Sequence, residues 1–494
     1  MYTEQSSSPV SPWLPWVMSL VGGVIGIMIG LLTGVQPLLP GLMIPATLIL
    51  IYSFNKFEWV LMGWLILRSS VDGMVSLQLP TIFALSLNAI GALFLVTQLF
   101  KRQKIHTDWF WWGFFTWWLI QGLWLVMMML GGLGFGSAML GDSLREWVRI
   151  FSWVMMYLLI MQMKDKMDPE RVITRLFLAL IAPVTIAILQ LTLPSILPAD
   201  FSVGGGDNSG NLVTSEVRVR GTIGHANGFA TLIFLFIGLT IWKVQQVTGR
   251  TKILWLGLLS ILAFFYVSAK ALYSLLMLVV FTVVMIAPRL SIAKLALGIL
   301  GVGAVMILFG STEFGQDRLA SVANTPLLNP NMDISRAIIL SKGDNNSFNW
   351  RIMQWTYLMG QFELSPILGY GIGTNRFISE NNLEPHNDYV RSLVEGGWVG
   401  FTTYIGFLLM QIVRLVQLLR ESYLQPSRHA LCLILLAVFM ALPVAMLTEN
   451  IWTHTLLFFM WYSLLAMAGW NWSSYNSEDP LKDKPKTPRL LGQR

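Results

Sequence analysis

Long apolar runs recur along this chain, and each is close to the length that crosses a bilayer. A transmembrane helix needs roughly 20 predominantly apolar residues, and runs of that kind follow one another from near residue 13 to about residue 470. Hydrophobic residues make up 55% of the 494 and charged residues only 12%, against about 25% charged in a soluble domain. The sequence therefore predicts an all-α polytopic membrane protein rather than a large soluble core.

Apolar windows bounded by charges and by glycine or proline clusters predict about 14 spans. The third window is short and the first two can form one broken element, so the predicted number is about 12–14. The windows lie near residues 13–35, 37–54, 57–70, 81–100, 109–130, 143–163, 172–194, 227–245, 252–269, 271–288, 293–310, 396–417, 429–448 and 451–470.

The distribution of charge predicts the orientation of these spans. With the N-terminus in the cytoplasm, nearly every short basic connection lies on the cytoplasmic side, as the positive-inside rule requires. Topology then explains the net charge of +7, and no basic-aromatic pattern typical of nucleic-acid binding accompanies it. The N-terminal segment lacks the basic region and cleavage site of a secretory signal, so we expect the first span to be retained.

This topology divides the chain into six parts, two of which are long outer segments. Long loops of this kind are usually functional or disordered, so we expect the chemistry on the outer face. The parts are N-terminal transmembrane helices (1–194), an outer loop (195–226), central transmembrane helices (227–310), a large extracytoplasmic loop with short helices and the candidate catalytic residues (311–395), C-terminal transmembrane helices (396–470) and a cytoplasmic tail (471–494).

The first outer loop ends in "EVRVRGTIGHAN", immediately before a predicted span. Arg218 and Arg220 alternate along an extended stretch, and in a strand-like segment they would point the same way. His225 and Asn227 follow in a turn at the lip of the span. These residues are candidates for binding an anionic group, with solvated interfacial arginines as the alternative.

Three further cations lie at predicted outer rims. Lys270 stands in "SAKA", between two apolar helices with almost no loop, where it either snorkels to the interface or marks a site. Arg145 and Arg149 are one helical turn apart at the start of a span, so they share a face. A guanidinium fork matches phosphate oxygens bidentately, although ordinary interfacial anchoring explains either arginine taken alone.

The second outer loop contains a predicted helix that Asn349 caps and that ends at Ser365-Pro366. Arg351 lies in its first turn, where a cation opposes the helix dipole, so the position favours a binding role. The following "GYGIG" (369–373) has no strand before it and no Lys-Ser/Thr after it. This stretch is therefore predicted to be a tight turn rather than a phosphate loop.

Titratable residues gather in "EPHNDYVRSLVEGGWVG", directly before a span. Asn387 or Asp388 can cap a helix there, which places His386 at a helix N-terminus on the outer face. The helix dipole favours neutral imidazole at such a position, and this is the form that a general base needs. A satisfied interfacial histidine is the alternative. Arg391 and Glu395 are i,i+4 partners that we expect to brace the helix.

No metal site is predicted, because the outer histidines His225 and His386 belong to separate loops and neither HExxH nor DxD occurs. Cys432, the only cysteine, lies in an apolar run and is expected to be buried, so disulfides and thiolate metal sites are excluded. One base, several arginines and a lysine suit a membrane-proximal, lipid-linked diphosphate. Cations would hold the leaving diphosphate while the base deprotonates an incoming hydroxyl.

The chain resembles the bacterial O-antigen ligase and O-antigen polymerase family of integral-membrane glycosyl-transfer proteins. His386-Asn387, nine residues and then Gly397-x-x-Gly400 resemble the family signature H-[NSQ]-x9-G-x-x-G, in the expected place after the large outer loop. The segments "RGTIGHANGFA", "SAKA" and "NWR…W" before "PILGYGIG" are similar to further family segments. The similar region covers about residues 217–449.

The resemblance implies a protein of the bacterial cytoplasmic (inner) membrane that acts at its extracytoplasmic face without a cofactor or metal. It would transfer a glycan from an undecaprenyl-diphosphate carrier to an acceptor hydroxyl, with inversion. His386 would be the base, and Arg351, Lys270 and Arg220 would contact the diphosphate. The other candidates are Arg218, Arg145 and Arg149 for the diphosphate, and Asn387, Glu395, His225 and Asn227 in supporting positions.

Two residues depart from the family pattern. Lys270 stands where arginine is usual, so it would bind a diphosphate in a monodentate way, and Ala226 replaces a frequent proline. Ligase and polymerase activity both stay open, as does the acceptor, which is a lipid-linked glycan, lipid A core or a protein hydroxyl. A bicarbonate-type transporter and a non-catalytic scaffold of polysaccharide assembly are the alternatives. The scarcity of charges inside spans and the lack of an evident inverted repeat disfavour transport.

Overall fold

The computed structural model describes most of the chain from residue 56 to residue 472. The described residues are 56–133, 136–202, 218–286 and 292–472, the last with gaps at 314, 318–319, 321–325, 327–328, 330, 333–335, 338–339, 341–346 and 380–381. The chain divides into two compact units, Met1–Leu61 and Met62–Arg494, and the site described below lies in the second. The first two predicted spans and nearly all of the cytoplasmic tail lie outside the described residues.

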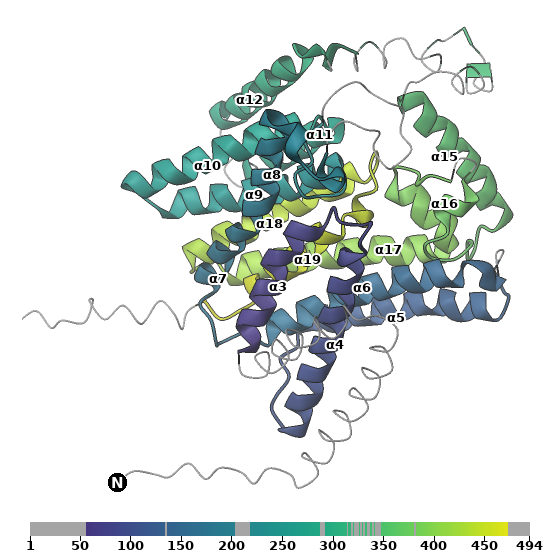
Figure 1. The fold of residues 1–494 in the computed structure, drawn as a ribbon, viewed down its shortest axis with the longest axis horizontal. Helices are drawn as coiled ribbons and strands as arrows, with labels where there is room; N and C mark the ends of the chain where they lie inside the picture. The colour runs from purple at the N-terminus through teal and green to yellow at the C-terminus, as the bar shows by residue number, and fades with distance from the viewer. Residues whose placement is uncertain are drawn as a thin grey trace, which may run out of the picture. The chain divides into compact units, whose positions relative to one another are not determined.

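Helices make up most of the described chain (Figure 1), and no strand occurs within the described ranges. The α-helices are α3 (Phe57–Val71), α4 (Leu79–Phe100), α5 (Trp109–Met129), α6 (Leu140–Met161), α7 (Pro169–Leu176), α8 (Ile181–Thr192), α9 (Ala226–Gln246), α10 (Gly249–Ser268), α11 (Leu272–Ile286), α12 (Ile292–Gly310), α15 (Ser347–Leu364), α16 (Asn375–Ile378), α17 (Asp388–Glu421), α18 (Pro426–Ala445) and α19 (Thr455–Ala468). Short 3₁₀ turns are η1 (Gly136–Met139), η2 (Phe177–Leu180), η3 (Pro194–Ile196), η4 (Ala199–Phe201) and η7 (Ile451–Thr453).

Seven described helical runs are long and apolar enough to cross a membrane, which confirms the prediction of an all-α polytopic protein. They are α4, α5, α9, α10, α17, α18 and the continuous run Pro169–Thr192 that joins α7, η2 and α8. Helices α11, α12 and α19 contain shorter apolar segments, at Tyr273–Ile286, Ala296–Gly310 and Thr455–Ala468. Every window predicted between residues 57 and 470 coincides with a described helix, including α6, whose first half carries several charged residues.

Two groups of helices meet around α18 and α19. Helices α5, α6 and α17 lie side by side (Figure 1), and α6 also packs against α19. Helix α18 contacts α9, α11 and α17. Helix α19 is buried along nearly its whole length, and Cys432 in α18 is buried as predicted. The turn between α18 and α19 therefore lies where several helices converge.

A polar link locks α5, α6 and α17 together. Asp108 caps α5 by accepting a hydrogen bond of 2.8 Å from the Trp111 backbone N–H. The other carboxylate oxygen of Asp108 lies 2.6 Å from Arg414 Nη2 and accepts a bond of 2.7 Å from the Tyr157 hydroxyl. Because each charged group has a partner, the low-dielectric interior tolerates the pair.

The signature glycine Gly397 marks a kink in α17. Its φ of 60° and ψ of −162° interrupt the helix, so the predicted start of a span at this glycine is confirmed as a break between two helical segments. The backbone N–H groups of Trp398 and Val399 donate to Pro366 O at 2.8 Å and to Ile367 O at 3.2 Å. A Cβ at position 397 would lie 2.3 Å from the Ile367 carbonyl carbon, so this close approach requires glycine.

The predicted helix of the second outer loop forms, but it starts earlier than predicted. Helix α15 begins at Ser347, so Asn349 lies inside it and the predicted cap at Asn349 is wrong. The helix ends at Leu364, as the Ser365-Pro366 pair predicted. The "GYGIG" stretch is a turn, with φ of 66°, 114° and 73° at its three glycines.

Candidate active site

A carboxylate to which the sequence analysis assigned no role lies at the centre of the candidate site. Glu449 is 3% exposed and stands in the turn between α18 and η7. Its Oε1 lies 3.3 Å from His386 Nδ1, and its Oε2 accepts a hydrogen bond from Asn227 Nδ2. Glu449 therefore joins the loop before α17 to the N-terminus of α9.

His386 is held in an unusual backbone conformation at the start of α17. Its φ of 48° is in the left-handed region, which costs a residue other than glycine about 1 kcal/mol or more and is common at functional sites. Asn387 caps the helix as predicted, because its Oδ1 accepts bonds of 3.0 and 3.1 Å from the backbone N–H groups of Tyr389 and Val390. The Trp350 ring packs edge-on against the imidazole, with centroids 5.7 Å apart.

The Glu449 carboxylate selects the tautomer of His386. Burial alone would raise the pKa of Glu449, but the charge and hydrogen bond of His386, together with the charges of His225 and His454, outweigh burial and hold this pKa below its usual range. An ionised carboxylate only accepts hydrogen bonds, so in the neutral form of the ring His386 donates from Nδ1. Its Nε2 then carries the lone pair that a general base needs.

Arg218 extends the network on the Asn227 side. Its Nη2 donates to Asn227 Oδ1 at 2.6 Å, and its Nε donates to Ala269 O at 3.3 Å. Ala269 directly precedes Lys270, which has a φ of 50° in the turn between α10 and α11. The predicted cations Arg218 and Lys270 therefore belong to the same corner of the fold.

Arg351 approaches the same carboxylate from α15. Burial lowers the pKa of Arg351, the Glu449 carboxylate opposes this effect, and the charge of Arg218 adds to it. Its buried Nε atom has no hydrogen-bond partner among the described residues. The indole N–H of Trp355, one turn further along α15, donates to Pro385 O and ties this helix to the loop that carries His386. Arg351 is thus a half-buried cation with an unused donor beside the histidine.

Arg220 and His225 occupy supporting positions. Residues 218–220 do not form a strand, and Arg220 binds different partners from Arg218. Its guanidinium donates to the backbone carbonyls of Gly224 at 3.0 Å and Ser202 at 2.9 Å. His225 caps α9, since its Nδ1 accepts a bond of 3.1 Å from the Asn227 backbone N–H. Arg220 therefore shapes the loop that presents His225 and Asn227.

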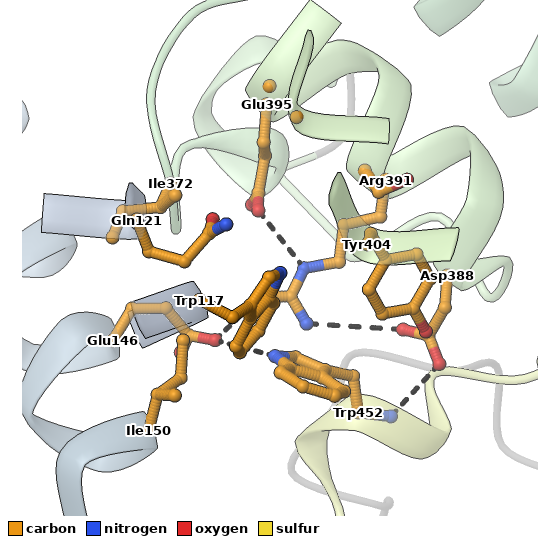
Figure 2. A pocket seen from close by; sticks show the side chains of 13 residues that line it. Trp117, Gln121, Glu146, Ile150, Ile372, Asp388, Arg391, Glu395, Tyr404 and Trp452 are labelled. Carbon is orange, nitrogen blue, oxygen red and sulfur yellow. Dashed lines mark hydrogen bonds and ion pairs between the residues drawn. The ribbon is translucent and has the colours of Figure 1, made fainter. Parts of the chain in front are cut away.

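A second charged cluster lies around Arg391 (Figure 2). Arg391 Nη2 is 2.8 Å from Glu146 Oε1, and its Nε is 3.3 Å from Glu395 Oε2, which confirms the predicted pair of Arg391 with Glu395. Glu146 also accepts hydrogen bonds from Arg149 and from the Trp452 indole. A cavity of about 50 Å³ is lined by Arg391, Glu146, Glu395 and Trp452, among other residues. The cluster joins α6 and η7 to the first turns of α17.

The candidates Arg149 and Glu395 belong to this second cluster, whereas Arg145 pairs with Asp142. Glu395 binds Arg391 and Asn375, so any effect of Glu395 on His386 would act through α17. Arg149 binds Glu146, and Arg145 is 72% exposed and pairs with Asp142 at 3.2 Å. Their proposed contacts with a diphosphate stay predictions.

Sequence reasoning missed Glu449, His454 and Asp388. Thr231 Oγ1 lies 2.9 Å from the buried His454 Nδ1, so this histidine contacts α9 one helical turn after Asn227. The signal for Glu449 was present, because a lone acid stands in a very short turn between two apolar runs. His454 was concealed inside an apolar window, and Asp388 was considered only as a helix cap.

The described part of the chain contains no group of three or more histidine, cysteine, aspartate or glutamate side chains that could hold a metal ion. Three histidines influence Glu449, but the contacts that they make are hydrogen bonds to protein groups. The chemistry that these residues offer is proton transfer beside a group of cations.

These features define a multi-pass α-helical membrane protein with a histidine–carboxylate pair beside arginines. Residues 253–405 match the family model described as O-antigen ligase. The match, which covers less than half of the chain, confirms the predicted resemblance to the O-antigen ligase and polymerase family and supports glycosyl transfer of that general type. A search of curated proteins finds no match to this chain.

The matched segment contains only part of the site. Lys270, Arg351 and His386 lie within residues 253–405, whereas Asn227 and Glu449 lie outside them. The centre is therefore completed by helices on both sides of the matched segment.

Proposed function

We propose that this protein transfers a glycan from an undecaprenyl-diphosphate carrier to an acceptor hydroxyl, with His386 as the general base. The observation that carries the proposal is the 3.3 Å contact between His386 Nδ1 and Glu449 Oε1, beside Arg218 and Arg351. A base with an orienting carboxylate and nearby cations matches a reaction that removes a proton and releases an anionic leaving group.

In the proposed step, His386 Nε2 takes the proton of the acceptor hydroxyl. The acceptor oxygen then bonds to the anomeric carbon of the glycan, and the bond from that carbon to the diphosphate oxygen breaks. Undecaprenyl diphosphate departs with the electron pair, and a single displacement of this kind inverts the anomeric centre. Arg351 and Lys270 would stabilise the charge that develops on the leaving diphosphate, with Arg218 and Arg220 behind them.

Glu449 would contribute in two ways. Its ionised carboxylate fixes the tautomer that leaves Nε2 unprotonated, and it stabilises the imidazolium that forms when His386 accepts the proton. Asn227 holds the other oxygen of Glu449, so the carboxylate cannot rotate away from the ring. The geometry thus supports a base that is oriented before the substrate arrives.

The proposal places this reaction at the extracytoplasmic face of a bacterial inner membrane, where the predicted topology puts both long loops. The partners would be an undecaprenyl-diphosphate-linked glycan as donor and a lipid-linked glycan, lipid A core or protein hydroxyl as acceptor. No cofactor or metal enters the proposed step. The segment 311–348 is the proposed acceptor surface.

The decisive experiment supplies the purified full chain with undecaprenyl-diphosphate oligosaccharide and each candidate acceptor, with and without chelator. His386→Ala should abolish transfer, while His429→Ala should not. His429 is a matched control because its ring contacts Leu419 O at 3.1 Å, near the opposite end of α17 from His386. Chain extension would indicate a polymerase, and modification of core lipid a ligase.

Other outcomes would contradict the proposal. Transfer that survives in His386→Ala would remove the proposed base, and loss of transfer with chelator would overturn the metal-free step. If the wild type never turns over but proteoliposomes take up bicarbonate, the transporter alternative would replace it. The buried charges near the site do not favour transport, because Arg391, Glu146 and Glu395 pair with one another.

A further inference from the structure

Asp388 contacts both sides of the turn that carries Glu449. The backbone N–H of Asp388 donates to Met446 O at 2.9 Å, at the end of α18. Its side-chain Oδ2 accepts a hydrogen bond of 2.9 Å from the backbone N–H of Trp452, in η7. Met446 and Trp452 stand three residues before and three residues after Glu449, so one residue fastens both ends of the turn.

We propose that Asp388 is a positioning residue that holds Glu449 against His386. The inference rests on the proposed function of His386 as a base. Asp388 follows His386 by two residues, so its backbone moves with the loop that carries the histidine. Because Asp388 binds Met446 and Trp452, it holds the Glu449 turn in a fixed position relative to the His386 loop. This position brings Glu449 Oε1 within 3.3 Å of His386 Nδ1.

The surroundings of Asp388 do not match those of a residue kept for packing. Asp388 is 2% exposed, and its Oδ1 has no hydrogen-bond partner among the described residues. The Nη1 atom of Arg391 is 4.0 Å from this oxygen and is also without a hydrogen bond to the described protein atoms. A buried oxygen without a partner is unfavourable, so an apolar side chain at position 388 would give a more stable protein. The aspartate is therefore explained by the hydrogen bond that its Oδ2 accepts from Trp452.

Figure 2 shows how the two oxygens of Asp388 are used. One points toward Arg391 at the edge of the cavity, and the other reaches the backbone of Trp452. The cavity of about 50 Å³ has room for water, which needs roughly 10–15 Å³ per molecule. A water molecule between Asp388 Oδ1 and Arg391 Nη1 would give both atoms a hydrogen-bond partner without disturbing the contact to Trp452.

Tyr389 provides a matched control. Its hydroxyl donates to Pro443 O at 2.7 Å, so it also fastens α17 to α18. Pro443 precedes Met446 and lies inside α18, outside the turn that carries Glu449. Tyr389→Phe therefore loosens the helix contact but leaves both attachments of the turn intact.

The test measures transfer by purified full-length variants, together with their thermal unfolding. Asp388→Ala should lower kcat by roughly 10–100-fold, the range typical of residues that orient a functional side chain, while KM for the donor stays within about twofold. Asp388→Asn should recover most of kcat, since an amide oxygen still accepts the Trp452 N–H. Tyr389→Phe should keep kcat within about twofold of the wild type.

A double-mutant cycle separates positioning from general stability. If Asp388 acts through Glu449, Asp388→Ala combined with Glu449→Gln should be no slower than Glu449→Gln alone. Multiplied losses would overturn the inference, as would an equal kcat loss in Tyr389→Phe. If Asp388→Ala does not accumulate in the membrane, Asp388→Glu serves instead, because it keeps the carboxyl group but one added methylene displaces the turn. Wild-type kcat in Asp388→Glu would then overturn the inference.

The failure of this inference differs from the failure of the proposed function. If His386→Ala and Glu449→Gln both leave transfer intact, the proposed base is wrong. If both abolish or strongly reduce transfer while Asp388→Ala does not, only the positioning role is wrong.

Discussion

Glu449 Oε1 lies 3.3 Å from His386 Nδ1, although the two residues are 63 positions apart in the sequence. One residue comes from the loop before α17 and the other from the turn after α18. Asn227 at the start of α9 joins them through the second carboxylate oxygen. The candidate centre therefore depends on three helix ends that meet only in the folded protein.

Glu449→Gln should remove a contribution to stability that depends on pH. The pKa of Glu449 in the folded protein is below its usual value, so this contribution is fully present above the unfolded pKa of about 4.3. It is lost as the pH falls through the folded pKa. We expect the wild type to exceed Glu449→Gln by about 1–3 kcal/mol at pH 7, with the same difference at about pH 5 and a smaller one below about pH 4. Thermal unfolding in detergent at several pH values measures this, and a difference that grows in acid would contradict it.

Arg351→Ala should lower kcat/KM for the glycan donor more than Arg351→Lys does. Hydrogen bonds to charged groups contribute about 1.5–3 kcal/mol, so their loss should lower kcat/KM for the donor by roughly 10–100-fold. Lysine keeps the charge but not the fork, and we expect an intermediate loss. Steady-state kinetics against donor concentration checks the order. Arg376→Ala is the control, because Arg376 pairs with Asp142 at 3.0 Å and has no role in the proposed step. Equal losses at both positions would count against a diphosphate role.

The two signature glycines should differ in their tolerance of alanine. Gly397 has a positive φ of 60°, and its added Cβ would meet the Ile367 backbone at 2.3 Å. The nearest atom to a Cβ at Gly400 is in the Trp124 side chain at 3.4 Å. Gly397→Ala should therefore destabilise the protein by about 2 kcal/mol or more, and Gly400→Ala by less than about 1 kcal/mol. Comparison of the two melting temperatures tests this, and equal shifts would refute the role assigned to the kink.

Arg391→Met should destabilise the protein strongly, because it leaves the buried carboxylates of Glu146 and Glu395 without their shared cation. Breaking a buried ion pair by removing one partner costs about 3–5 kcal/mol. Arg145→Met is the control, since this side chain is 72% exposed and should change stability by less than about 1 kcal/mol. Denaturation of both variants in the same detergent measures the contrast. A small effect at Arg391 would mean that the cluster does not brace α6 against α17.

The periodic signals of the sequence predicted the helices well. Apolar windows of bilayer length located every described span, because no water is present in the bilayer core and a single chain segment can satisfy its backbone there only as a helix. Gly397 was read correctly as a break, and Asn387 was correctly among the predicted caps. The start of α15 was missed by three residues, because several polar residues near Ser347 can begin a helix equally well.

The site was predicted only where motif residues lie on one segment. His386, Arg351 and Lys270 were identified as candidates from local context, and the structure brings His386 and Arg351 to the same carboxylate. Glu449 could not be paired with His386 from spacing, since the contact depends on how α18 packs against α9 and α17. A contact between side chains on different helices produces no periodic pattern in a single sequence, so it could not be predicted.

The division of the site across the matched segment limits how such proteins can be recombined. Exchange of residues 253–405 between two relatives would import His386 and Arg351, but each chimera would keep the Glu449 and Asn227 of its host. Such chimeras should be active only when the carboxylate of the host's Glu449 lies within hydrogen-bond distance of the imported His386 ring. We therefore expect full activity only in chimeras that exchange Asn227 and Glu449 together with the matched segment.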